Sequence, residues 1–444
     1  MAEVVVRRDG SSNFGPKNRF AVFPGFSAGW NINKEDFWTI DQVDQLKLRF
    51  SWGQNGNEAI APFSYTSIIG NDYYYVLGEN ATILNGAVPA TLVNPDVRWE
   101  TSEQLDIGLD LSLWDGMLVF GFDYYTKYTK DLLLKPVIED VRGNESPFYN
   151  IGEIKNQGVE LQLSYNKQWG DFKLGINANA AYLKNEVLAV GNDNGYVDGV
   201  QWMTNMDYAT RMEEGMPLGY FYGYRTLGIF QNQEEIDSYR YPDGTLIQPF
   251  AQPGDLIFQD TDGQGGITSD DRTMIGNPWP KWTYGLNITA GWKGFDFATF
   301  LTAKTHLDVM TCQYKLNYRG SANMPTFYLD AWQQEGDRTN IPRLTAIDPN
   351  ENYRRASDHF MFDASFIKIG LIELGYTLPD KIVHKMKMSR MRVYAAMDNA
   401  AIFTKYQLFD PEVGPMEDNV LSTGLDRSIY PQARTTRLGL SVDF

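Results

Sequence analysis

The stretch Gln104-Leu-Asp-Ile-Gly-Leu-Asp-Leu-Ser-Leu113 decides the fold. Leucine or isoleucine occupies every second position, and Gln, Asp, Gly and Ser fill the positions between. Side chains of a β-strand point alternately to opposite faces, so this pattern predicts a strand with one aliphatic and one hydrophilic face. The stretch is also long enough to cross a bilayer as a strand, which takes about 9–11 residues.

The same alternation recurs along the whole chain, at 46–52, 159–165, 172–182, 284–292 and 438–444. Strands of this kind place apolar residues against lipid and polar residues toward a wet lumen. We therefore predict an all-β fold, a transmembrane antiparallel β-barrel with long extracellular loops. The residues expected on its polar inner wall are Asp106, Asp110, Glu160, Gln162, Asn177 and Asn179. A soluble sandwich or propeller is the alternative, but its strands average nearer 5–6 residues.

Composition narrows the function. The sequence contains no run of about 18 apolar residues, so it predicts no transmembrane helix. Aromatic residues make up 14% of the chain, which suits the aromatic girdles of a barrel. The net charge of −17 argues against a nucleic-acid partner and leaves open whether acidic loops serve solubility or a ligand. The single cysteine, Cys312, excludes an internal disulfide and a cysteine-based metal cluster.

Alternation and turn residues predict about fourteen strands. They are expected at 2–8, 19–32, 44–54, 99–114, 116–130, 153–168, 171–186, 218–230, 254–259, 280–292, 294–308, 363–377, 390–403 and 433–444. The turns at 114–116, 169–171 and 293–294 are tight, whereas long connections fill 55–98, 131–152, 187–217, 309–362 and 404–432. Short turns on one side and long loops on the other are the layout of an outer-membrane barrel.

Several spaced motifs occur in one order along the chain. They include 8–20 with Phe23-Pro24, 46–53, Asn94–Thr101, Asp123-Tyr-Tyr125, Asn150-Ile-Gly152, Asn156–Glu160, Asp271-Arg-Thr273 with Ile275–Pro278, Asp398-Asn399, Asp410-Pro-Glu412 and Tyr430-Pro431. Together with the terminal strand, they resemble the SusC/RagA family of TonB-dependent outer-membrane transporters. The resemblance covers essentially all of the chain.

That resemblance implies import of oligosaccharides or peptides across the bacterial outer membrane. The implied partners are a SusD-like surface lipoprotein, the TonB-ExbB-ExbD system acting through a plug domain, outer-membrane lipid and the glycan or peptide substrate. Family members are about twice as long, and their barrels have about 22 strands. Residues 1–444 are therefore expected to be the C-terminal part of such a barrel, without the plug and early strands. The residues after Met1 lack the apolar core of an export signal, which fits the same expectation.

Two other functions stay open at this point. A passive outer-membrane porin would need no plug and no energy source. A secreted β-rich glycan-binding module would need its apolar faces packed into a dry core. An enzyme is not expected, because His306, His359 and His384 are scattered without a metal-ligand spacing.

One local motif resembles a twelve-residue calcium loop. Across 260–271, Asp stands at the first and third positions, Gly at the sixth position and Asp at the twelfth. Calcium requires clustered hard oxygens and a residue that permits the sharp turn. The predicted ligands are Asp260, Asp262, Gln264, Gly266 and Asp271. The alternative is a turn whose side chains hydrogen-bond their own backbone.

Aromatic residues in the long loops are weak candidates for contact with substrate. They are Tyr65, Tyr74, Trp202, Tyr208, Trp332 and Tyr353. Such rings could stack on sugars, or they could simply pack within the loops.

Overall fold

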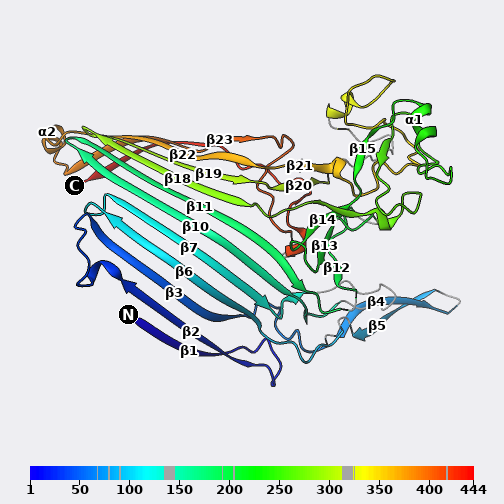
Figure 1. Ribbon diagram of the computed structural model, residues 1–444, viewed down its shortest axis with the longest axis horizontal. Helices are drawn as coiled ribbons and strands as arrows, with labels where there is room; N and C mark the ends of the chain where they lie inside the picture. The colour runs from blue at the N-terminus through cyan, green and yellow to red at the C-terminus, as the bar shows by residue number, and fades with distance from the viewer. Residues whose placement is uncertain are drawn as a thin grey trace.

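The computed structural model describes all residues except 68, 79–80, 90–91, 135–145, 193, 204–205, 313–323, 325 and 417–418, and except the side chains of 72, 73 and 82. A 12-stranded antiparallel sheet dominates the molecule, and its strands lie side by side (Figure 1). In order across the sheet, they are β1 (Ala2–Gly10), β2 (Phe20–Asn31), β3 (Val43–Asn57), β6 (Glu100–Leu113), β7 (Leu118–Lys130), β10 (Glu153–Trp169), β11 (Phe172–Ala189), β18 (Trp282–Trp292), β19 (Phe295–Thr305), β22 (Phe366–Thr377), β23 (Arg390–Thr404) and β25 (Thr435–Asp443). We call this sheet the wall.

The register of the wall separates an apolar face from a polar face. Directly paired residues share a face, and Leu109 pairs with Leu48 and Phe122. The complete row runs through Trp30, Leu48, Leu109, Phe122, Leu161, Ala180, Tyr284, Ala303, Ile367 and Phe403. The neighbouring residue Asp110 belongs to a polar row with Lys47 and Gly121.

The aliphatic residues of β6 lie on the outer side of the wall, as the alternation predicts. They are Leu105, Ile107, Leu109, Leu111 and Leu113. In the described part of the chain, none of them belongs to a buried hydrophobic cluster, and Ile107 is 47% exposed. No second sheet packs against this face, because the other described sheets have four strands or fewer and lie among the loops. A face of this composition is suited to lipid.

Connections alternate in length, as predicted. Tight turns join β6 to β7, β10 to β11 and β18 to β19 at one end of the wall, on the left of Figure 1. The turn between β22 and β23 lies at the same end and contains the short helix α2 (Asp380–Val383) and a 3-10 turn, His384–Met386. The long connections gather at the opposite end.

These long connections form a layer with its own secondary structure, which we call the loop layer. Its elements are β4 (Ile69–Leu77), β5 (Thr82–Pro89), β8 (Leu133–Leu134), β9 (Tyr149–Asn150), β12 (Tyr196–Asp198), β13 (Thr210–Glu213), β14 (Tyr220–Gly223), β15 (Thr226–Ile229), α1 (Gln233–Ser238), β16 (Leu256–Phe258), β17 (Thr273–Gly276), β20 (Asp308–Thr311), β21 (Met361–Asp363) and β24 (Leu425–Asp426). Its largest core contains fully buried Trp202, Phe221, Met310, Phe360 and Leu425. Segments that lie far apart in sequence therefore share one core within this layer, whereas β4 and β5 pair only with each other in the described structure.

Two predicted wall strands are wrong. The segments 218–230 and 254–259 belong to the loop layer, where β14, β15 and β16 are each three or four residues long. Phe221, Leu256 and Phe258 are buried there. A short strand buried in a protein core appears in the sequence as a continuous apolar run. Such a run cannot be told from part of a longer strand by its pattern alone.

Strands β1 and β25 are the two edges of the wall and do not pair with each other. Val4–Arg7 pair with β2, and Leu438–Val442 pair with β23. Among the described residues, no helix is long and apolar enough to cross a bilayer.

Candidate functional site

The polar face of the wall contains a charge cluster centred on Arg49 of β3. The Arg49 guanidinium lies 2.8 Å from carboxylate oxygens of both Asp110 and Asp123, and 3.9 Å from Asp106. Three carboxylates from β6 and β7 thus share one cation. Charged groups are costly on a lipid-facing surface, so this face is the lumen side of the wall.

The other residues predicted for the inner wall share this face. Glu160 pairs with Asp123 across the sheet, and Gln162 pairs with Asn179. Ser164 pairs with Asn177, and its hydroxyl lies 2.7 Å from the Asn177 side-chain oxygen. The predicted placement of the polar residues is therefore confirmed.

A four-stranded sheet of the loop layer, formed by β12, β13, β14 and β17, lies against the lumen side of the wall. Val197 and Met212 on one face of this loop sheet share a buried cluster with Ile154 of β10 and Val187 of β11. Residues two positions apart in a strand point to the same face. Ile154 therefore lies on the polar face with Asn156, and Val187 lies on it with Asn185. The opposite face of the loop sheet therefore turns away from the wall.

That opposite face is a stack of arginine and aromatic side chains. The Arg211 guanidinium lies between the rings of Tyr196 and Tyr222, 3.8 and 3.7 Å from their centroids. Arg272 lies 4.4 Å from the Tyr222 ring. Cation–π contacts of this kind strengthen when water is excluded.

Arg355 extends the stack from a different loop. Its guanidinium lies 5.0 Å from the ring of Tyr224 and 5.2 Å from that of Phe258. Burial raises the pKa of Tyr224 to about 12, so its phenol stays neutral at physiological pH. Asp198 holds Arg211 in place at the other end of the stack, because a carboxylate oxygen of Asp198 lies 2.9 Å from the Arg211 guanidinium.

A cleft of about 380 Å³ opens beside Arg355. Its lining residues are Gln201, Met206, Asp207, Glu351, Arg354 and Arg355. Glu351 and Arg355 pair at 3.1 Å, and Arg354 is exposed. The cleft therefore presents both signs of charge at the edge of the stack.

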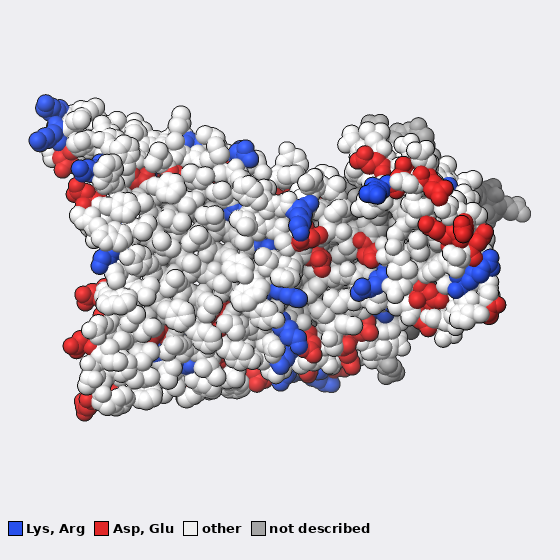
Figure 2. Space-filling view, turned by 45° about the horizontal axis from the view of Figure 1, so that its top comes forward, with Lys and Arg blue, Asp and Glu red and all other residues white. Residues whose placement is uncertain are grey.

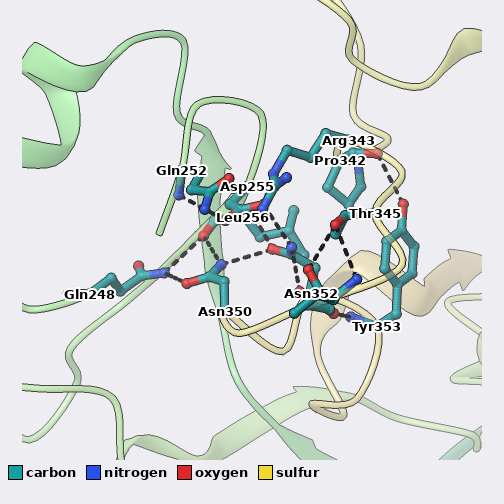
Figure 3. Close-up of polar contacts among 12 residues, drawn as sticks. Gln248, Gln252, Asp255, Leu256, Pro342, Arg343, Thr345, Asn350, Asn352 and Tyr353 are labelled. Atoms are coloured by element: carbon teal, nitrogen blue, oxygen red, sulfur yellow. Dashed lines mark hydrogen bonds and ion pairs between the residues drawn. The ribbon is translucent and has the colours of Figure 1, made fainter. Parts of the chain in front are cut away.

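A buried polar network holds the two longest loops together (Figure 3). Asp255 is fully buried, and Arg343 donates to it at 2.6 Å while Asn352 donates at 2.9 Å. Gln248 donates to Asn350 at 2.8 Å, and the Leu256 amide donates to Asn352 at 2.8 Å. These bonds join residues 248–256 to residues 343–352 and fix the surface that carries the stack.

The predicted aromatic contacts divide into buried and accessible residues. Trp202 is fully buried, with its ring 4.2 Å from Phe360 and its indole nitrogen donating to the Thr311 carbonyl. Tyr353 is 4% exposed and donates to the Pro342 carbonyl. Both rings belong to the loop-layer core, which favours the alternative that they pack within the loops.

The remaining four candidates are accessible to different degrees. Tyr65 packs against the cluster around Phe14 and Trp99. Tyr208 and Trp332 are half-buried, and the Trp332 indole donates to Gln231. Tyr74 of β4 is 63% exposed, so it is the most accessible of the predicted rings.

The predicted calcium loop brings its carboxylates together. Ligand oxygens of Asp260, Asp262 and Asp271 all lie within 4.8 Å of one another. Backbone amides also reach them, because Gly263 donates to Asp260 at 2.7 Å and Thr261 donates to Asp271 at 2.6 Å. Burial raises the pKa of Asp260, and the nearby Asp271 charge adds to the effect.

The other two predicted ligands, Gln264 and Gly266, lie in the same turn. The Gln264 amide donates to Asp262 at 2.8 Å, and Gly266 has a positive φ of 80°. The arrangement combines a hydrogen-bonded turn with a compact group of three carboxylates, which is the chemistry that suits a hard divalent cation.

The Arg49 cluster and the arginine–aromatic stack were not predicted as sites. One signal was present, since Tyr220, Tyr222 and Tyr224 alternate along the chain, as do Arg211 and Glu213. Their partners come from distant segments, and Tyr224 and Arg355 are 131 residues apart, so the sequence pattern alone could not assemble them.

Comparisons with known proteins agree with the wall and the loop layer. Residues 4–400 match the family model described as TonB dependent receptor-like, beta-barrel. TonB-dependent receptor P3 of Formosa agariphila is 32% identical over 99% of this chain and 43% of its own length. TonB-dependent receptor SusC of Bacteroides thetaiotaomicron is 28% identical over 99% of this chain and 42% of its own length.

A solved structure, that of the RagAB peptide transporter, has the same fold. It superposes with a TM-score of 0.79 at 23% identity, covering 100% of this chain and 46% of that chain. This chain thus spans less than half the length of the relatives it matches. The resemblance to the SusC/RagA group is confirmed, as is the bacterial outer membrane as the location of the barrel. The family model covers most of the chain, and the chain therefore belongs to the TonB-dependent receptor-like β-barrel family.

Proposed function

We propose that residues 1–444 form the C-terminal part of the barrel of a SusC-like transporter, which imports oligosaccharides or peptides across the outer membrane. In this proposal a SusD-like surface lipoprotein delivers the substrate, and TonB-ExbB-ExbD supplies energy through a plug domain. The observation that carries the proposal is the loop sheet, which lies on the lumen side of the wall and turns its charged face away from it.

Peptides are the substrate class that the cleft favours. Asp207 and Glu351 offer carboxylates, and Arg354 offers an exposed guanidinium. Groups of both signs suit the two termini and charged side chains of a peptide, whereas a neutral sugar is commonly held by stacking on an open ring. Here both Arg211 and Arg272 contact the Tyr222 ring.

The two alternative functions receive less support. A secreted glycan-binding module would bury the aliphatic face of the wall against a second layer, and the outer face around Ile107 has no such cover in the described structure. A passive porin would have the same sheet. It differs from a TonB-dependent transporter because it needs no energy source.

Uptake measurements test the proposal. Cells that depend on this protein should take up short peptides only when TonB and the proton gradient are intact, and loss of the neighbouring SusD-like lipoprotein should reduce uptake. Uptake that persists without TonB would identify a porin instead.

Substitutions in the cleft test the peptide assignment separately from the import function. Asp207→Asn combined with Arg354→Gln should reduce peptide uptake by roughly tenfold or more, if each lost charge-assisted bond contributes about 1 kcal/mol. Arg338→Gln, an exposed loop cation outside the cleft, is the matched control. Unchanged peptide uptake in the double variant, with oligosaccharide uptake retained, would overturn the peptide assignment but not the import function.

A further inference from the structure

One row of aromatic side chains crosses the outer face of the wall at its short-turn end. Strand pairing connects Trp169, Phe172, Trp292, Phe295 and Tyr376 in that order. Trp169 and Phe172 stack with centroids 6.0 Å apart, and Phe295 and Tyr376 lie 4.5 Å apart. Tryptophan and tyrosine concentrate at the level of the lipid headgroups in outer-membrane barrels. This row therefore marks the membrane–water interface on the side of the short turns.

The turn between β22 and β23 begins immediately beyond this row. Its exposed cations are Lys381, Lys385, Lys387 and Arg390, and we call residues 378–390 the basic turn. Figure 2 shows Lys and Arg gathered at this corner of the molecule, at the upper left. A strand rises about 3.3 Å per residue, so these cations lie within reach of the headgroups that the aromatic row marks.

Carboxylates of the described structure offset only part of the positive charge of the basic turn, and Asp171 and Asp296 line a hollow with Arg390. Asp380 is the only carboxylate in 379–391, and Asp443 lies opposite Arg390 in the strand register. No described ion pair joins any of the four exposed cations to a carboxylate. Arg392, the next cation, is different because Asp296 and Glu373 bind it on the lumen side.

Apolar side chains accompany these cations. Ile382 and Met386 are 48% and 49% exposed, while Val383 is fully buried and anchors the turn to the protein. Segments that combine exposed cations with exposed apolar residues next to a bilayer bind at the headgroup boundary.

The charge of the basic turn also contrasts with its surroundings. The chain as a whole has a net charge of −17. The connection between β2 and β3 lies at the same end of the wall and contains Glu35, Asp36 and Asp41 with one lysine, Lys34. Lys293 is the one cation of the tight turn between β18 and β19, so the basic turn is the most cationic connection at this end of the wall.

We propose that the basic turn binds the phosphate groups of anionic phospholipids in the periplasmic leaflet. Lys381, Lys385 and Lys387 contact the phosphates, Arg390 at the start of β23 adds positive charge beside them, and Ile382 and Met386 insert among the adjacent acyl chains. A phospholipid fits better than a soluble acidic protein, because the aromatic row fixes the depth of the turn at the bilayer surface.

The test measures lipid retained by the folded protein, with all segments of its native chain, in detergent micelles. Native mass spectrometry counts bound phosphatidylglycerol in competition with phosphatidylcholine. Each cation near an anionic surface contributes about 1 kcal/mol, or roughly fivefold in affinity. Replacing all four cations by Gln should therefore weaken phosphatidylglycerol binding by at least about tenfold and leave phosphatidylcholine unchanged.

Two control variants accompany the test. Lys381→Arg, Lys385→Arg and Lys387→Arg together preserve the charge and should preserve the preference for phosphatidylglycerol. Lys17→Gln, Arg19→Gln, Arg338→Gln and Lys405→Gln remove the same charge from exposed positions at the opposite end and should not change it.

Three outcomes would overturn the proposal. The first is equal phosphatidylglycerol binding by the four-Gln variant and the wild type. The second is displacement of the lipid by an equal concentration of inorganic phosphate, which would make the turn a site for free phosphate. The third is equally tight binding of a soluble acidic polypeptide, which would point to a protein partner.

Discussion

Leu109 and Asp110 are neighbours in β6, yet the register places them in different environments. Leu109 lies in an apolar row with Leu48 and Phe122, and Asp110 is 2.8 Å from Arg49. The alternation in the sequence was sufficient to predict both placements, because a strand with period 2 leaves no other choice once one face is apolar. The partner Arg49 was not predicted, since its contacts depend on how the strands align.

Replacing Leu109 with Arg should destabilise the barrel by about 2–4 kcal/mol, because the charge would face lipid near the middle of the bilayer. Gln162→Arg is the control, since Gln162 follows Leu161 of the same apolar row but lies on the lumen face. Its cost should be close to zero. Equilibrium unfolding in lipid vesicles measures both, and equal costs would show that the two faces are not distinguished by lipid.

Calcium should raise the melting temperature of the protein, because an ion bound only by the native state stabilises it. Asp262→Asn should abolish this shift with little effect in the absence of calcium, since Asp262 is exposed and accepts a hydrogen bond from the exposed Gln264 amide. Asp271 is unsuitable for this test because it also supports the turn.

Asp270→Asn provides the control for the calcium experiment. Asp270 is an exposed neighbour outside the carboxylate group, and its replacement should leave the calcium shift intact. If calcium leaves the melting temperature of the wild-type protein unchanged, the segment is a hydrogen-bonded turn only.

His359 should make the loop layer less stable at acidic pH. Burial lowers its pKa to about 4, whereas an unfolded histidine has a pKa of about 6.5. Between these values the unfolded state binds a proton that the folded state does not, so stability is lost as pH falls. The loss from pH 6.5 to 5 is about 2 kcal/mol.

His359→Phe should remove this dependence, because the ring already lies among Tyr353 and Phe360. Amide hydrogen exchange of the loop layer at pH 7 and pH 5 measures it. The half-buried Asp348 carboxyl has a pKa raised by partial burial and acts in the opposite direction, so the difference between variant and wild type isolates His359. An identical pH dependence in both proteins would contradict the assignment.

At the scale of elements, the sequence predicted long strands well and short ones poorly. The alternation predicts each of the twelve wall strands, but it also predicts wall strands where the structure has β14, β15 and β16. A long membrane strand must satisfy the same two environments along its whole length, so its pattern is explicit. A short strand in the loop layer takes its environment from distant segments, such as the Asn352 side chain that binds the Leu256 amide.

The polar network in Figure 3 should control the order of the loop layer. Arg343→Gln leaves the buried Asp255 carboxylate without its cation, which should cost about 3–5 kcal/mol of local stability. Faster hydrogen exchange and proteolysis should appear at 248–256 and 343–352 and spare the wall. Arg338→Gln, five residues away and exposed, is the control. Uniform destabilisation of the wall as well would show that the loops are not an independent unit.

At the scale of the molecule, the two ends of the wall have different chemistry. The short-turn end presents an aromatic row and the basic turn, and the long-loop end presents a packed layer with an arginine–aromatic stack. The sequence predicted the asymmetry from the lengths of the connections. It could not predict the loop sheet, because the contacts of Val197 and Met212 with Ile154 and Val187 join separate regions of the chain.

The open edges of the wall yield the last prediction. β1 and β25 each have a neighbour on one side only, and an unpaired edge invites pairing with further strands. If additional strands of the complete transporter complete the barrel between these edges, Val6 and Leu440 remain far apart. The double variant Val6→Cys with Leu440→Cys should then form no disulfide within one molecule, because bridged residues need Cα atoms within about 7 Å.

Val6→Cys with Pro24→Cys, which pair directly across β1 and β2, should cross-link readily under the same oxidation. Electrophoresis before and after reduction separates the outcomes, with Cys312 buried in both variants. A bridge between β25 and β1 in the monomer would mean that the twelve strands close on themselves, and the protein would then be a small porin.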